Sequence, residues 1–79
     1  MVGYVLIDTA PKKVREAFNE LVSLPEITEL HPLFGEYDFI AKIDSDDPDK
    51  IGKIVTNRIR RVDGVIDTKT LMGTTYKEL

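Results

Sequence analysis

Residues 2–7, which read VGYVLI, decide the fold. The run is rich in β-branched and aromatic side chains and predicts a strand. Side chains of both parities are apolar, with Tyr4 and Leu6 on one face and Val5 and Ile7 on the other. Because both faces need cover, we expect this strand to lie in the middle of a sheet. Helices can cover one face, and something else must cover the second.

Two helices are expected, one on each side of a central hairpin. The first begins near Pro11, where Asp8 or Thr9 can cap the free amides, and it ends before Pro25. The second follows a polar, aspartate-rich run that caps it, and Gly64 suits a left-handed stop just past its end. The apolar stripes at helical spacing are Val14, Ala17, Phe18, Leu21 and Val22 in the first helix and Ile51, Ile54, Val55, Ile59 and Val62 in the second.

Three further strands are expected, over residues 27–33, 37–43 and 65–72. Pro32 lacks a backbone N–H, so the first of these strands should lie at an edge of the sheet. A hairpin turn joins the first two strands, and Gly35 supplies a backbone shape there that other residues resist.

The resulting order of elements, β-α-β-β-α-β, is typical of a ferredoxin-like α+β sandwich. We expect a four-stranded antiparallel sheet in the order 4-1-3-2 with two helices on one face. This order places the two-sided apolar strand in the centre and the proline-containing strand at an edge, so two independent features of the sequence agree. A single domain is expected over residues 1–79, with a flexible polar tail over about 73–79.

Composition excludes several classes of protein. The chain has no cysteine and one histidine, so disulfides and thiolate metal sites are excluded, and we expect no metal and no cofactor. No apolar run approaches the roughly 20 residues of a membrane span. No secretory signal is visible, so a cytoplasmic location and no membrane partner are expected. The net charge of −3 argues against direct binding of DNA.

The second face of the sheet would be a large exposed apolar patch in this arrangement, and such patches mark interaction sites. A chain of 79 residues lies near the lower size limit for an independent core. The simplest cover is a second copy packed sheet against sheet in a two-fold dimer. The sequence therefore predicts a homodimer of the α+β barrel type.

Polar side chains on the strands and the hairpin are the candidate site. Asp38 follows the glycine turn, where it could receive an α-amino group or simply lock its own turn. His31 shares a strand parity with Glu29, which could orient it for acid–base chemistry, but a packing, interface or ligand-lining role is favoured. Thr68 and Thr70 share a face and could bind a polar ligand, although threonine is also a common strand residue.

Nearly the whole chain, from Tyr4 to about Met72, resembles the ligand-binding domain of Lrp/AsnC transcriptional regulators. The matching stretches are 4–7 (YVLI), 35–38 (GEYD), 58–65 (RIRRVDGV) and 68–70 (TKT), with His31 four residues before Gly35. The resemblance implies a dimer built through the sheets, further assembly into a higher oligomer, and effector sites between dimers. The ligands would be amino acids or related small metabolites. The ligand-binding residues that it indicates are His31, Gly35, Glu36, Tyr37, Asp38, Thr68 and Thr70.

The helix-turn-helix half of such regulators is not recognised in this sequence. We therefore expect a stand-alone sensing and oligomerisation domain that modulates transcription indirectly, with a full-length Lrp/AsnC regulator as a further candidate partner. We do not expect an enzyme and assign no catalytic residue. Two alternatives stay open, because fold alone does not separate them: a purely structural assembly domain with no ligand, and a small cofactor-free enzyme of the dimeric α+β barrel class. The enzyme would use His31 and Tyr37 as an acid–base pair and needs a buried cavity of roughly a few hundred Å³.

Overall fold

The computed structural model describes residues 1–73, and the tail expected beyond them lies outside the described residues. The elements follow the order β1 (Val2–Thr9), α1 (Val14–Val22), β2 (Glu29–Pro32), β3 (Phe39–Asp44), α2 (Pro48–Ile54) and β4 (Val65–Met72). A 3₁₀ turn, η1 (Pro11–Lys13), precedes α1, and a π-helical turn, η2 (Val55–Ile59), continues α2. The predicted β-α-β-β-α-β order is confirmed.

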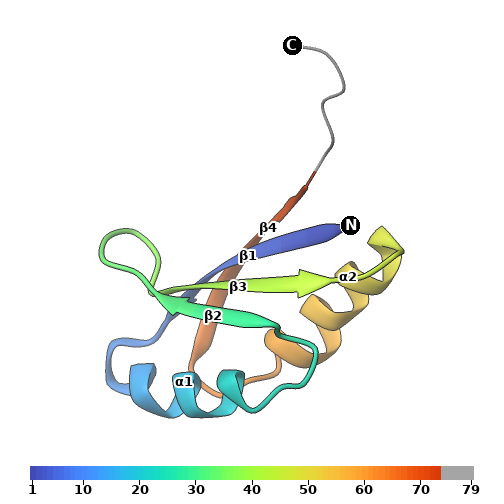
Figure 1. The fold of residues 1–79 in the computed structure, drawn as a ribbon. Coiled ribbons are helices and arrows are strands. Elements are labelled where there is room, and N and C mark those ends of the chain that lie inside the picture. Colours follow the sequence, from blue (N-terminus) through green and yellow to red (C-terminus); the bar gives the residue numbers. More distant parts are fainter. Residues whose placement is uncertain (74–79) are drawn as a thin grey trace.

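The four strands form one antiparallel sheet in the order β2-β3-β1-β4, which is the predicted order read from the other edge. The central strand β1 pairs with β3 on one side and with β4 on the other. Both helices cover the same face of the sheet (Figure 1). The ferredoxin-like α+β fold is therefore confirmed, and so is the edge position of the strand that contains Pro32.

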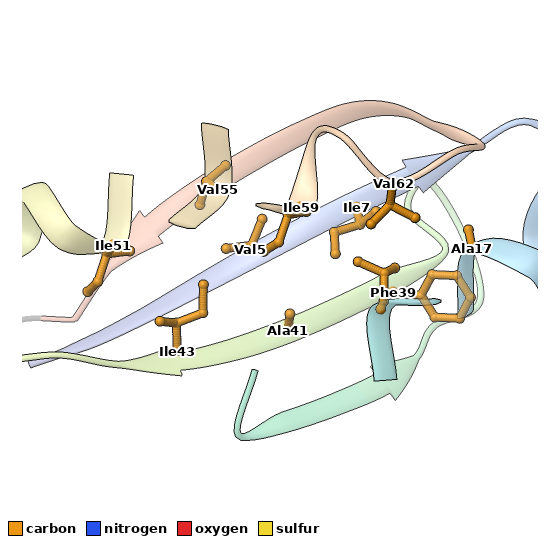
Figure 2. Packing of buried hydrophobic residues seen from close by; sticks show 11 residues of the cluster. Val5, Ile7, Ala17, Phe39, Ala41, Ile43, Ile51, Val55, Ile59 and Val62 are labelled. Atoms are coloured by element: carbon orange, nitrogen blue, oxygen red, sulfur yellow. The ribbon is translucent and has the colours of Figure 1, made fainter. Parts of the chain in front are cut away.

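The core lies between that face and the helices. Figure 2 shows alternate residues of β1 and β3 directed toward the helical layer. The buried residues of the core are Val5, Ile7, Phe39, Ala41 and Ile43 from the sheet and Ala17, Leu21, Ile51, Val55, Ile59 and Val62 from the helical layer and the turn after it. The predicted stripes are confirmed at these positions. The prediction was wrong for Val22, which is 57% exposed. Adjacent residues of a helix point to different sides, so Val22 is exposed where Leu21 is buried.

The start of the first helix differs from the prediction. Strand β1 continues to Thr9, so Asp8 and Thr9 belong to the strand, and Ala10 begins the helical segment without a side-chain cap. Thr9 instead donates hydrogen bonds from its amide and its hydroxyl to a distant carboxylate. The second helix is capped as predicted, because Oδ1 of Asp47 accepts the N–H of Asp49 at 2.9 Å.

The second helix changes type along its length. The N–H of Arg60 donates to the carbonyl of Val55 at 2.8 Å, a bond that spans five residues as in a π-helix. Gly64 then adopts a φ of +96°, which confirms the predicted left-handed glycine. Its carbonyl accepts the N–H of Ala10 at 2.8 Å and so connects the end of the second helical segment to the start of the first. None of the described helices is long and apolar enough to cross a membrane.

Candidate functional site

No described element covers the sheet face opposite the helices (Figure 1). We call this surface the open face; its side chains on β1, β3 and β4 include Tyr4, Leu6, Ile40, Lys42, Lys69 and Leu71. The strand register places Tyr4 between Lys42 and Leu71. Tyr4 is 39% exposed and Leu71 is 46% exposed. The apolar residues of β1 that do not face the helices are therefore left in solvent in a single copy.

A charged cluster lies on the open face beside edge strand β2. Oε1 of Glu29 lies 3.1 Å from Nε2 of His31, and Oε2 of Glu29 accepts from Nζ of Lys42 at 3.2 Å. The hydrogen bond with His31 first, and that from Lys42 second, hold the pKa of Glu29 below its ordinary value. Its bond to Glu29 in turn raises the pKa of Lys42. The predicted proximity of His31 and Glu29 is confirmed.

Lys42 is a member of this cluster that sequence reasoning missed. Its signal was its position on β3, because the register pairs it directly with Glu29 across the β2–β3 ladder. Together with Tyr4 and Ile40, these three polar side chains line a hollow of about 110 Å³. That volume is well below the roughly 300–1,000 Å³ of a typical metabolite pocket.

The acid–base pair of the enzyme alternative finds no support in one copy. The side chain of His31 is 62% exposed. Within residues 1–73 no hydrogen bond joins His31 to Tyr37, and no group of three or more His, Cys, Asp or Glu side chains is placed to hold a metal ion.

The connection between β2 and β3 is longer than the predicted turn and projects beyond the end of the sheet (Figure 1). The N–H of Leu33 donates to the carbonyl of Asp38 at 2.8 Å and closes the loop. Gly35 has a φ of +131°, which confirms the special backbone shape expected there. Glu36 is exposed and Tyr37 is half-buried. The side chain of Phe34 is fully exposed in this loop, and no role was predicted for it.

Asp38 fixes this loop to the central strand. Its Oδ2 accepts the backbone N–H of Thr9 at 2.8 Å and the Thr9 hydroxyl at 2.7 Å. The hydroxyl bond first, and the amide bond second, lower the pKa of Asp38. Asp8 lies beside it, and desolvation first, then the hydrogen bond and charge of Asp38, raise the pKa of Asp8. The alternative in which Asp38 locks its own turn is therefore wrong about the partner, because its Oδ2 accepts from Thr9 of the central strand.

Thr68 and Thr70 lie on the other side of the sheet from His31. The register pairs Thr68 with Ile7 and Thr70 with Val5, whose side chains are buried beneath the helices. The two threonines therefore belong to the helix-covered face of edge strand β4, where both are half-buried. The structure does not bring the seven predicted ligand-binding residues together within one copy. His31 on β2 and the loop residues Gly35, Glu36, Tyr37 and Asp38 form one set, which we call the loop group. Thr68 and Thr70 form a separate pair on the helix-covered face.

Comparison with known protein families identifies the family of this chain. The family model of the Lrp/AsnC ligand binding domain matches residues 2–74. The chain belongs to the Lrp/AsnC family. This Lrp/AsnC chain is 28% identical over 78 residues to an uncharacterized HTH-type transcriptional regulator of Pyrococcus abyssi, covering 99% of the chain and 49% of the regulator. It spans about half the length of the curated relatives it matches, which are named as transcriptional regulators.

Solved structures agree with this assignment. The crystal structure of FFRP-DM1 superposes with a TM-score of 0.84 at 30% identity, covering 92% of this chain and 97% of that one. The structure of AsnC from E. coli superposes with a TM-score of 0.85 at 26% identity, covering 99% of this chain and 54% of that one. The resemblance found in the sequence is confirmed.

Proposed function

We propose that this chain is an amino-acid or small-metabolite sensing and oligomerisation domain of Lrp/AsnC type. In this proposal residues 1–79 form one cytoplasmic, non-enzymatic domain that modulates a transcriptional regulator indirectly. Its partners are further copies of itself and a full-length Lrp/AsnC regulator, and it does not bind DNA directly. The family match to a ligand-binding domain supports the sensing role. The single observation that carries the assembly role is the uncovered apolar open face.

A second copy of the chain is the proposed cover for the open face. Tyr4, Leu6, Ile40 and Leu71 offer a contiguous apolar strip across three strands, suited to packing sheet against sheet. The two lysines on this face do not oppose the contact, because Lys42 is held toward β2 by Glu29, and Lys69 lies on edge strand β4. Burial against an identical strip gives a two-fold dimer and a larger shared core.

The ligand site is proposed at the joins between copies. This follows from the separation of the loop group and the threonine pair, since a metabolite that contacts both must be bound by more than one copy. Exposed backbone amides around Gly35 suit an α-carboxylate. Glu36, and the oxygen of Asp38 that Thr9 does not use, suit an α-amino group.

L-Methionine is the first ligand to test. A transcriptional regulator of Neisseria meningitidis, NMB0573, was crystallised as an L-Met complex and shares this fold with a TM-score of 0.82 at 19% identity. The experiment is isothermal calorimetry of the assembled protein with each of the twenty amino acids. We expect binding of at least one, weakened tenfold or more by Glu36→Gln. Glu20→Gln, at an exposed position on α1, is the control and should bind normally. No heat from any amino acid would overturn the ligand assignment.

A further inference from the structure

We infer that a second contact between copies is made by Phe34, which enters a groove beside α1 of a neighbouring copy while the neighbour's Phe34 enters the groove of the first. This inference rests on the proposed oligomerisation and deepens it. It adds a second contact between copies to the one at the open face. Three features of the chain support it: an exposed aromatic side chain, a largely apolar groove, and a pair of opposite charges.

The first feature is the aromatic side chain at the loop. Phe34 has a relative exposure of 106%, and Leu33 beside it is 40% exposed. Figure 1 shows the loop projecting past the end of the sheet, away from the core. Aromatic side chains, phenylalanine among them, are enriched in protein interfaces relative to the rest of the surface.

The second feature is a groove between α1 and the β2 edge of the sheet. It has a volume of about 510 Å³ and is lined by Val14, Arg15, Phe18, Asn19, Pro32 and Phe39. The rings of Phe18 and Phe39 lie with centroids 5.6 Å apart at an interplanar angle of 38°, and they form its aromatic floor. Figure 2 shows Phe39 beside α1, next to Ala17. A further ring can pack against such a tilted pair in a favourable edge or offset arrangement.

The third feature is charge. Arg15 lies at the groove and is exposed, and Glu36 follows Phe34 by two positions and is exposed as well. Within the part of the chain that is described, neither Arg15 nor Glu36 has an ion-pair partner. When Phe34 occupies the groove, Glu36 of that loop approaches Arg15 of the other copy. Opposite charges on the two rims favour this orientation over others.

The contact is reciprocal because its two halves are neighbours on one surface. Pro32 lines the groove and lies two positions before Phe34. One patch therefore carries both the projecting side chain and the groove, which is the requirement for a two-fold contact. The groove lies on the helical side of the sheet, so this contact and the open-face contact can form together. Their combination places the loop residues Gly35 and Tyr37 at a join between copies.

Cysteine cross-linking tests the contact directly, since the natural chain has no cysteine. Leu33→Cys and Asn19→Cys are prepared separately, mixed, and treated with a short thiol cross-linker, which leaves Phe34 in place. We expect a mixed covalent dimer. Leu33→Cys mixed with Glu20→Cys is the matched control, because Glu20 is an exposed residue of α1 on the side of the helix away from the groove, and it should not cross-link. Equal yields from the two mixtures would overturn the inference.

The strength of the contact is measured by sedimentation equilibrium in a Tyr4→Lys background, in which the open-face contact is removed. There Phe34→Ala should raise the dissociation constant at least about 30-fold, the effect of removing an interface anchor. Arg15→Glu and Glu36→Arg should each weaken association, and the double variant should restore it. An unchanged constant for Phe34→Ala, matching that of the control Glu20→Ala, refutes the contact. If Tyr4→Lys leaves the assembled mass unchanged while the cross-link forms, the open-face dimer fails and this contact stands.

Discussion

Asp38→Ala removes the acceptor that joins the β2–β3 loop to the central strand. In the native chain Oδ2 of Asp38 accepts two hydrogen bonds, from the amide of Thr9 at 2.8 Å and from its hydroxyl at 2.7 Å. Thr9 is only 4% exposed, so both donors lose their partner in a place with little access to water. Hydrogen bonds to a charged group contribute about 1.5–3 kcal/mol each, and relief of the repulsion from Asp8 offsets part of the loss.

The expected net loss of unfolding free energy is about 2 kcal/mol, which lowers the melting temperature by roughly 8–16 °C for a domain of this size. The measurement is urea unfolding followed by circular dichroism, at one fixed protein concentration because association also stabilises the fold. Asp38→Asn keeps an acceptor oxygen in place without the charge and should lose only about half as much. Glu36→Ala, in the same loop, has no such bond and should stay within about 0.5 kcal/mol of the natural chain.

A double-mutant cycle separates this pair from general loop damage. Thr9→Val removes the hydroxyl and keeps the volume, so its effect should shrink in the Asp38→Ala background. A coupling energy of about 1 kcal/mol or more is expected. Additive effects, or an Asp38→Ala chain as stable as Glu36→Ala, would show that the carboxylate does not hold the loop.

Three further predictions concern pH, the helix connection and the core. Asp8→Asn should lose stability relative to the natural chain as pH falls from neutral toward about 4, because the raised pKa of Asp8 lets the folded state take up a proton before the unfolded state does. The lowered pKa of Asp38 acts in the opposite sense, so its contribution is present above the unfolded pKa and is lost on further acidification; urea midpoints across the pH range check both. Gly64→Ala should cost about 1–3 kcal/mol, because φ is +96° and the new Cβ would lie 2.6 Å from Cβ of Lys13, whereas Gly35→Ala meets open space and should cost less. Leu21→Ala should cost about 2–5 kcal/mol, while Val22→Ala, one position on and 57% exposed, should cost under about 0.5 kcal/mol; equal thermal shifts would contradict the assigned core.

The sheet could be predicted from the sequence because its main determinants are local. The two-sided apolarity of Val5 and its neighbours fixed β1 in the centre, and the missing N–H of Pro32 fixed β2 at the edge. The helix stripes followed from spacing alone, apart from Val22 at the margin of its stripe.

The contacts that the sequence missed are long-range ones. Asp8 and Thr9 have the composition of a helix cap, yet pairing with β4 extends β1 through them, and Thr9 finds its acceptor 29 residues away in Asp38. The contact between His31 and Glu29 could be predicted from the sequence because the two residues are two positions apart on one strand. Lys42 joined them only through the β2–β3 register, which spacing does not give.

The faces of the candidate site residues show the same limit. Thr68 and Thr70 were correctly placed on one side of their strand, but which side faced the helices depended on pairing with Ile7 and Val5. The groove beside α1 likewise combines residues from the helix, β2 and β3, and no single stretch of sequence contains it.

The account depends most on the claim that another copy covers the open face. The direct measurement is the mass of the Phe34→Ala variant by sedimentation equilibrium from micromolar to millimolar concentration, because that variant leaves the open face as the remaining contact. We predict a particle of at least twice the 9.0 kDa chain, reduced to a single chain by adding Tyr4→Lys. A species that stays at 9.0 kDa over the whole range would contradict the claim.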